Sequence, residues 1–345
     1  MSNPETSNTP AGRFGKFGLI DHITRNTVIY NPGTVTGKGD DAAVIDPGNE
    51  LTLVSTDLLL EGIHFNLVYT PMKHLGYKAV IRAISDIYAM NGTPEQILIA
   101  VGISTRFSVE HLEELYEGIG LACKRYRIDL AGGDTTSSLT GMTIGVTAIG
   151  KGARDRIVRR NGARPNDLIC ATGSFGASYM GLQVLERERK IFDKDNPVQP
   201  DLSGYEYIIE RQLKPEFPEK VLKDLSSASI LPTSMIDVSD GLASDLIHVC
   251  RLSGTGCRIY HERIPVDNET WKSAEEFNID PMIPALNGGE DYELLFTIPL
   301  EYAEAIKTIP DVALIGHMTV QEQGCFLVTG EGNEVELRAQ GWEKE

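Results

Sequence analysis

The chain has 345 residues, of which 41% are hydrophobic, enough for about two domains with separate cores. Its 49 acidic residues outnumber 32 basic ones, giving a formal charge of −17, which argues against nucleic acid as a partner. The N-terminal stretch is polar and no later run is apolar enough to span a membrane, so we expect a cytoplasmic protein with no membrane partner.

Apolar periodicity in the first half of the chain predicts alternating strands and helices. Strands are expected at residues 51–57, 97–103 and 141–150. One helix should cover residues 72–90 and end near Asn91-Gly92, and a second should run from an N-cap at Ser108 to about residue 125. Residues 129–131 should then lead into a turn at Gly-Gly-Asp.

The second half repeats this alternation after a basic, glycine-containing passage at residues 152–165. Strands are expected at residues 168–172, 234–238, 292–298 and 325–328, and helices at residues 177–189, 207–212 and 242–252. Ser253-Gly254 should close the last of these helices. The fold class is therefore α/β, with residues 1–152 expected as one domain and residues 153–345 as the other.

The five cysteines are scattered, odd in number and without a C-x-x-C pair. Their spacing indicates neither a disulfide framework nor a zinc site. We expect mostly buried thiols in a reducing compartment.

Aspartates recur at the ends of the expected elements, next to glycine or hydroxyl residues. An α/β sheet presents functional groups at such ends. Most of these aspartates also have a plain structural explanation, as turn residues, helix caps or surface ion pairs. The pair Asp40-Asp41 is harder to explain in that way, because a turn gains nothing from a second adjacent charge. The group comprises Asp41, Asp57, Asp86, Asp134, Asp237 and Asp240.

Carboxylates that converge need a cation, since two of them about 4 Å apart repel by roughly 4 kcal/mol near a protein surface. Carboxylate and hydroxyl oxygens without paired histidines or thiolates favour Mg²⁺ or Mn²⁺. Ser55 and Thr56, directly before Asp57, add oxygens of this kind. The sequence therefore predicts a magnesium site.

Magnesium without a redox motif indicates phosphate chemistry, yet the chain has neither a Walker-type phosphate loop nor the protein-kinase motifs. Phosphate would be held by metal, by backbone amides at Gly132-Gly133 and by an arginine such as Arg160. His64, in EGIHF, could donate to a substrate phosphate or be a satisfied structural histidine, and both remain open. Glu290, in GGEDYELLF, could bind a polar or cationic ligand group.

With these motifs together, the chain resembles the thiamine-monophosphate kinase family, of the superfamily that includes aminoimidazole ribonucleotide synthetase, selenophosphate synthetase and a hydrogenase maturation factor. The resemblance is carried, in order, by GDDAAV, STDLLLEGIHF, LGYKAVIRAISDIYAM, AGGDTT, RRNGARPND, DVSDGLASDL and NGGEDYELLF. It implies ATP-dependent phosphorylation of thiamine monophosphate to thiamine diphosphate, by direct in-line transfer with several Mg²⁺ ions and no phosphoenzyme.

The resemblance also assigns residue roles. The implied metal ligands are Asp41, Ser55, Thr56, Asp57, Asp86, Asp134, Asp237 and Asp240. The implied ATP contacts are Tyr116, Gly133, Asp134, Arg160 and Ser239. The implied contacts to thiamine monophosphate are His64, Glu290 and Trp342, the last stacking on the thiamine rings.

The implied architecture is a two-domain fold like that of aminoimidazole ribonucleotide synthetase. Its N-terminal domain binds ATP and Mg²⁺ and pairs its sheet into a barrel within a homodimer, and its C-terminal α/β domain completes the active site.

Two alternatives remain. The first is another ATP-dependent enzyme of the superfamily, similar to aminoimidazole ribonucleotide synthetase. Selenophosphate synthetase and the hydrogenase factor fit less well, because the first cysteine is Cys123 and the chain closes in GWEKE. The second is a non-catalytic sensor of nucleotide or thiamine phosphate, against which the full set of carboxylates argues.

Overall fold

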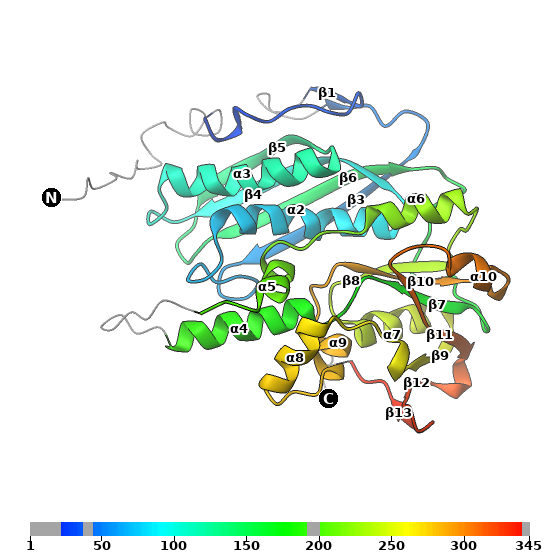
Figure 1. The fold of residues 1–345 in the computed structure, drawn as a ribbon. Helices are drawn as coiled ribbons and strands as arrows, with labels where there is room; N and C mark the ends of the chain where they lie inside the picture. The colour runs from blue at the N-terminus through cyan, green and yellow to red at the C-terminus, as the bar shows by residue number, and fades with distance from the viewer. Residues whose placement is uncertain (1–21, 37–43, 192–200, 340–345) are drawn as a thin grey trace. The chain divides into compact units, whose positions relative to one another are not determined.

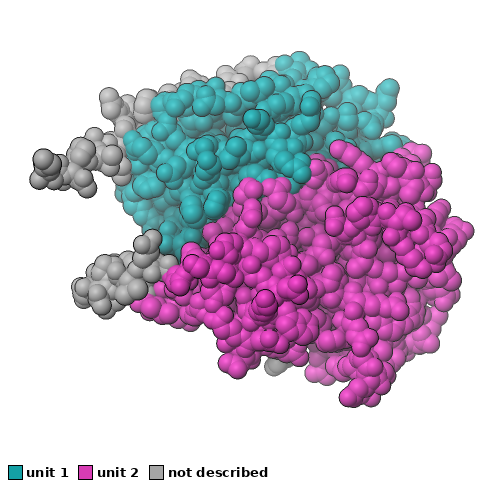
Figure 2. All heavy atoms as spheres, viewed as in Figure 1, with its two compact units in different colours: residues 1–87, 92–154 teal, residues 88–91, 155–345 magenta. Residues whose placement is uncertain are grey.

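The computed structural model describes residues 22–36, 44–191 and 201–339. Its contacts divide the chain into two compact units, residues 1–87 with 92–154 and residues 88–91 with 155–345 (Figures 1 and 2). Each unit combines a β-sheet with helices, so the expected α/β class is confirmed. In the described part of the chain, no helix has the length and apolar character needed to cross a bilayer.

Unit 1 is built on a four-stranded sheet in the order β3-β6-β4-β5, with a separate two-stranded ribbon of β1 and β2. Strand β6 runs antiparallel to β3 and β4, whereas β4 and β5 are parallel and are connected through α3. The elements are β1 (Thr34–Thr36), β2 (Val44–Ile45), β3 (Leu51–Leu60), α2 (Met72–Ala89), β4 (Thr93–Ile103), α3 (Val109–Tyr126), β5 (Asp129–Ser137) and β6 (Thr143–Gly152).

Local sequence explains why α3 forms where it does. Its buried residues recur every three or four positions and make one apolar face. Ser108 is the N-cap in a capping box with His111, Lys124 and Arg125 lie in the last turn, and Arg127 ends the helix in a left-handed conformation with φ 58°. The predicted start at Ser108 is therefore confirmed.

Helices α2 and α3 lie side by side (Figure 1), and two glycines let their backbones touch. A Cβ atom on Gly76 would lie 2.0 Å from the carbonyl oxygen of Leu115, and one on Gly118 would lie 1.8 Å from that of Lys73. Only glycine fits at these two positions, so the spacing of the two helices is fixed by the absence of side chains.

The expected Gly-Gly-Asp turn is not a turn. Residues 132–134 continue strand β5 and pair with Leu98, Ile99 and Ala100 of β4. A Cβ atom on Gly133 would lie 1.9 Å from the Ile99 carbonyl oxygen. The glycine therefore allows a close approach of two strands, where the sequence prediction placed a reversal of the chain.

Unit 2 is built on a seven-stranded sheet in the order β13-β12-β9-β11-β7-β10-β8. Neighbours are antiparallel except for the parallel pair β9 and β12. Its strands are β7 (Leu168–Thr172), β8 (Ser234–Val238), β9 (Thr255–Tyr260), β10 (Glu293–Ile298), β11 (Val312–Val320), β12 (Cys325–Val328) and β13 (Glu334–Glu336). Its helices are α4 (Ala177–Ile191), α5 (Glu206–Leu213), α6 (Glu219–Ser227), α7 (Leu242–Ser253), α8 (Asn268–Glu276), α9 (Met282–Asn287) and α10 (Ala303–Ile306), with short 3₁₀ turns at His261–Arg263, Leu300–Tyr302 and Gln321–Gln323.

Three strands of unit 2 are buried along their whole length. Every residue of β7, β10 and β8 is buried, although β8 is the last strand of the sheet. One hydrophobic core joins the sheet to α7 and α9, and a smaller one joins α4, α5 and α8. These cores hold the loops at the ends of β8 and β10 in place.

A buried charge network fixes the start of β10. The Arg211 guanidinium donates to a Glu293 carboxylate oxygen at 2.8 Å and to the Asp291 carbonyl oxygen at 2.7 Å. The Thr172 hydroxyl donates to the other Glu293 oxygen at 2.6 Å, and the Gly176 backbone N–H donates to the Asp291 carboxylate at 2.9 Å. Burial raises the pKa of Asp291 to about 7, against the opposing effect of Arg211. The start of β10 is thus held by buried polar groups that bond to one another and not to water.

We expect Gly118→Ala to destabilise unit 1 by about 3 kcal/mol, the upper range for overpacking, because the new methyl group would meet backbone that cannot move aside. Denaturant unfolding followed by circular dichroism measures this. The matched control is Gly120→Ala in the same helix, where a Cβ atom meets nothing within 4 Å. The control should gain up to about 1 kcal/mol from helix propensity. Equal unfolding midpoints for the two variants would contradict the tight helix contact.

We expect Asp291→Asn to change how stability depends on pH. The folded-state pKa of Asp291 lies above its ordinary value of 3.8, at about 7, so its stabilising contribution is present at low pH and is lost as the pH rises from about 4 to about 7. The free energy of unfolding of the parent protein should fall relative to that of the variant over this range, by a few kcal/mol at roughly 1.4 kcal/mol per pKa unit. Urea titrations at several pH values measure the difference. The exposed Asp155→Asn variant serves as control, and parallel curves for parent and Asp291→Asn would refute the buried titration.

Candidate active site

Three of the predicted ligands meet on the helix side of the unit 1 sheet. Ser55 and Asp57 are two residues apart on β3 and therefore face the same way, toward α2. The Ser55 hydroxyl donates to the Asp86 carboxylate on α2. Arg82, one turn before Asp86, donates to Asp57 at 2.9 Å. Arg82 of α2 therefore forms an ion pair with Asp57 of β3, which joins the helix to the sheet.

The electrostatics of Asp57 fit a cation. Burial raises the pKa of Asp57 above its ordinary value, and the Asp86 carboxylate raises it further, while the hydrogen bond from Arg82 opposes both. The second oxygen of Asp57, Oδ2, is buried and has no hydrogen-bond partner among the described residues. Two carboxylates and a hydroxyl with an unsatisfied oxygen form a donor set that suits a hard divalent ion such as Mg²⁺.

Thr56 and Asp134 lie on the opposite face of the same sheet. The Thr56 hydroxyl is 3.1 Å from that of Thr147 on β6. Asp134 of β5 pairs with Ala100 of β4, and Ala100 pairs with Gly145 of β6. Gly145 in turn pairs with Leu58 of β3, which is exposed. Residues paired in this way share a face of the sheet, so Asp134 lies on the same face as Leu58 and Thr56. Within unit 1 the side chains of Thr56 and Asp134 are therefore separated by the sheet from those of Ser55, Asp57 and Asp86.

The other predicted residues of unit 1 are held by local hydrogen bonds. His64 follows β3, and its Nδ1 accepts the Leu60 backbone N–H at 3.1 Å, which places the proton of a neutral ring on Nε2. Tyr116 lies on α3 and is buried, and burial raises its pKa to about 12 against a hydrogen bond with Thr135. Gly133 is explained by its strand contact alone. These observations leave the ligand roles of the three residues as predictions.

A second group of carboxylates lies in unit 2, at the junction of β8 and α7. Asp237 is the second-to-last residue of β8 and is buried, and Asp240 follows in the loop. The Asp240 backbone N–H donates at 3.2 Å to Asp245, in the first turn of α7. Burial raises the pKa of Asp245 to about 8, with further contributions from Asp237 and Asp240 and an opposing one from Arg160.

Asp245 was missed as a candidate from the sequence. It lies inside the motif DVSDGLASDL, but an acidic residue in the first turn of a helix is ordinary and gives no signal of its own. Only the strand-to-helix turn brings it against two other aspartates. The four groups together are three carboxylates and one guanidinium, an arrangement that can hold a cation and an anionic ligand side by side.

The loop that carries Glu290 interlocks with the loop that carries Ser239. The Glu290 backbone N–H donates to the Ser239 carbonyl oxygen at 2.8 Å, and a Cβ atom on Gly289 would lie 2.7 Å from that oxygen. Glu290 and Tyr292 both have left-handed backbones, with φ of 56° and 51°. Such conformations are uncommon for residues other than glycine and persist where the surroundings enforce them, often at functional sites.

Two predicted residues, Asp41 and Trp342, and the neighbouring Asp40, lie outside the described residues. Their roles stay predictions. A hollow of about 370 Å³ in unit 1 contains none of the predicted site residues in its lining, which is formed by Leu67, Thr70, Pro71, Met72, Arg106, Phe107, His111 and Glu114.

Comparison with known proteins places this geometry in a family. Residues 39–151 match the family described as AIR synthase related protein, N-terminal domain. A curated thiamine-monophosphate kinase from Aquifex aeolicus is 32% identical over 330 residues, which cover 95% of this chain and 97% of that protein.

Solved structures agree. The thiamine-monophosphate kinase of Stenotrophomonas maltophilia superposes with a TM-score of 0.77 at 27% identity, covering 93% of this chain and 96% of that one. A structure described as AaThiL complexed with AMPPCP and TMP superposes with a TM-score of 0.72 at 30% identity, covering 94% and 95%. The expected superfamily fold is confirmed by these matches. The chain belongs to the thiamine-monophosphate kinase family and is a thiamine-phosphate kinase.

Proposed function

We propose that the protein transfers the terminal phosphoryl group of ATP to the phosphate of thiamine monophosphate, giving thiamine diphosphate and ADP. The observation that carries the proposal is the similarity, over nearly the whole chain, to thiamine-monophosphate kinases and to a relative complexed with AMPPCP and TMP. The convergent carboxylates in each unit support it.

The reaction is a direct in-line transfer. A phosphate monoester has a second pKa near 6, so the acceptor is already an anionic nucleophile at pH 7 and needs no general base. The main obstacle is the repulsion between two anions. Bound Mg²⁺ would neutralise charge on the phosphates.

The chain's own residues would position the reactants. Mg²⁺ ions would be held by oxygens from Asp41, Ser55, Thr56, Asp57, Asp86, Asp134, Asp237 and Asp240, with Asp245 as an added candidate. ATP would be bound by Tyr116, Gly133, Asp134, Arg160 and Ser239. Thiamine monophosphate would be bound by His64, Glu290 and Trp342, where the indole ring offers a stacking surface.

In this proposal residues 1–152 form the ATP- and Mg²⁺-binding domain and residues 153–345 complete the active site. The first domain would also form a homodimer through its sheet. Two features support this: β3 is an edge strand, and its outward residues Val54 and Leu58 are 65% and 53% exposed. We further place the protein in the cytoplasm, in keeping with five free cysteines, four of them buried.

The test is to incubate purified protein with Mg-ATP and thiamine monophosphate and to follow thiamine diphosphate and ADP by chromatography, with free thiamine as the control acceptor. We expect equal amounts of the two products, and none from free thiamine. ATP binding with no thiamine diphosphate formed would overturn the proposal. Detection of aminoimidazole ribonucleotide from its formylamidine precursor would favour the other enzyme of the superfamily, and binding without any turnover would favour a sensor.

Asp86→Asn should lower turnover by more than about 100-fold, because changes in the second shell of a metal site alone cost about 10- to 100-fold. The fold should be kept, since the change also removes a like charge beside Asp57. Steady-state rates at increasing Mg²⁺, together with thermal unfolding, measure both effects. Glu117→Gln is the control, a carboxylate of α3 that pairs with Lys73 at the surface. Wild-type turnover in a folded Asp86→Asn protein would remove Asp86 from the metal set.

A further inference from the structure

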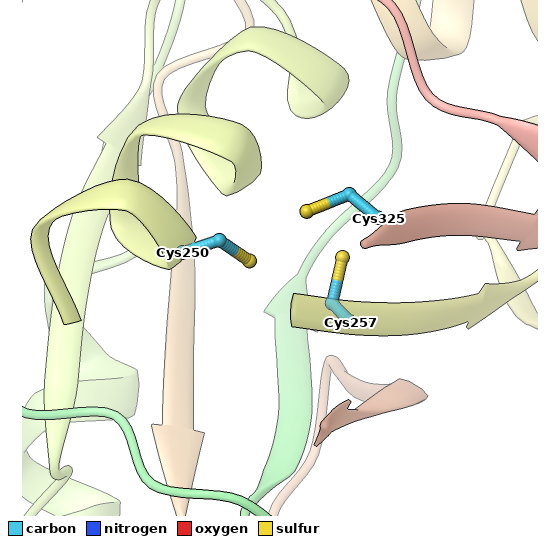
Figure 3. Close-up of side chains that lie close together, drawn as sticks. All are labelled: Cys250, Cys257 and Cys325. Carbon is cyan, nitrogen blue, oxygen red and sulfur yellow. The ribbon is translucent and has the colours of Figure 1, made fainter. Parts of the chain in front are cut away.

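Three cysteines that are far apart in the sequence converge in unit 2. Cys250 lies near the end of α7, Cys257 lies in β9, and Cys325 begins β12. Their sulfur atoms all lie within 4.8 Å of one another, and Figure 3 shows the three side chains pointing toward a common centre. Three sulfur atoms at this spacing could act together as ligands of one metal ion.

The backbone holds two of these cysteines in fixed positions. Cys257 and Cys325 are direct partners in the parallel pair of β9 and β12. The Cys257 backbone N–H donates to the Gly324 carbonyl oxygen at 3.0 Å, and the Cys325 carbonyl oxygen accepts the Leu337 N–H at 3.0 Å. The two side chains therefore leave adjacent strands on the same face of the sheet, toward α7.

Arg258 anchors the turn before Cys325. Its guanidinium donates to the carbonyl oxygens of Gln323 and Gly324, both at 3.1 Å, and is paired with Glu334 at 2.7 Å. It also lies over the Phe326 ring, 4.5 Å from its centroid. Outer contacts of this kind orient metal ligands before an ion arrives.

The three cysteines differ in how far solvent can reach them. Cys250 and Cys257 are 2% and 0% exposed and belong to the main core of unit 2, whereas Cys325 is half-buried. Cys325 is therefore the thiol that a metal ion would reach first.

A buried hydroxyl lies at the same place. Thr255 is two residues before Cys257 on β9, so its side chain faces the same side of the strand. It is 5% exposed, lies next to the Cys250 thiol, and is not satisfied by any oxygen or nitrogen atom of the described residues. The Thr255 hydroxyl therefore adds a polar atom beside the Cys250 sulfur.

We propose that Cys250, Cys257 and Cys325 form a binding site for one soft, thiophilic metal ion of the Cu⁺, Zn²⁺ or Cd²⁺ class. Three thiolates at about 2.3 Å from a shared ion lie about 4 Å apart, a spacing that small side-chain rotations reach from the observed one. Each thiol that binds releases its proton to solvent, so the product is a tris-thiolate complex and no electron is transferred. Soft sulfur ligands select such ions over Mg²⁺, so this site is chemically separate from the carboxylate groups described above.

The arrangement favours a metal over a disulfide. A disulfide would join two of the sulfurs, leave the third unused in the core, and require an oxidant. A metal ion would bind all three sulfur atoms in the same way.

Cd²⁺ is the probe, added to the full-length reduced protein in a buffer with a phosphine reductant. We expect one Cd²⁺ per chain by native mass spectrometry, a sulfur-to-cadmium charge-transfer band in the ultraviolet, and a rise in the unfolding temperature. Cys325→Ser should lose the band and the temperature rise, and because this residue is half-buried the variant should still fold.

Cys170→Ala is the matched control, a cysteine of the same unit that is fully buried in β7 and outside the group. It should keep the band. Protection of the half-buried Cys325 thiol from alkylation by bound Cd²⁺, read by mass spectrometry on the parent protein, tests the same site without any substitution. Absence of Cd²⁺ uptake, or an unchanged band in Cys325→Ser, would overturn the proposal. A disulfide that forms readily among the three in a protein that binds no Cd²⁺ would replace it with a thiol switch.

Discussion

Carboxylates that share a partly buried position repel one another, and each unit of this protein holds such groups together by packing. In unit 1, strand β3 and helix α2 set Asp57 beside Asp86, with Ser55 and Arg82 as the nearest compensating groups. In unit 2, the turn from β8 to α7 sets Asp245 against Asp237 and Asp240, with Arg160 opposing their charge. A bound cation would relieve the repulsion in both places. The fold therefore already holds these carboxylates where they could bind a cation together.

The rigidity of the surrounding structure makes this arrangement possible. In unit 1 the backbones of α2 and α3 touch at Gly76 and Gly118, which leaves α2 little freedom to move Asp86 away from β3. In unit 2 the buried network of Arg211, Asp291 and Glu293 fixes the start of β10, and the loop before it interlocks with the loop after β8. Left-handed backbones at Glu290 and Tyr292 are maintained by these contacts.

The two kinds of candidate metal site differ in chemistry as well as location. The carboxylate groups present hard oxygen atoms, which suit Mg²⁺ and phosphate chemistry. The three sulfurs of Cys250, Cys257 and Cys325 lie against the core behind the sheet of unit 2 and suit soft ions. Because the ligand types do not overlap, an ion of one class would compete poorly for the site of the other.

The sequence by itself determined most of the elements and the chemical type of the site. The pattern of apolar residues located α2, α3 and α7 and the buried strands β7, β8 and β10. These elements are predictable because each has a pattern of apolar residues within its own short segment. The pattern did not locate β9 or β11, whose mixed polar and apolar residues are stabilised by pairing with distant strands. The motifs and their order along the chain also indicated the family. A site for phosphate and metal needs particular residue types, and these residues lie in short motifs that can be recognised in the sequence.

Only the tertiary structure decided which side chains meet. It set Ser55, Asp57 and Asp86 on one face of a sheet and Thr56 and Asp134 on the other, which depends on register and not on proximity in the chain. It showed that the Gly-Gly-Asp segment is part of a strand contact and that Asp245 lies against two other aspartates. It also brought together three cysteines whose spacing in the sequence gave no sign of a shared site. The physical reason is the same in each case: a contact between residues far apart in sequence is fixed by strand pairing and helix packing, which no local pattern encodes.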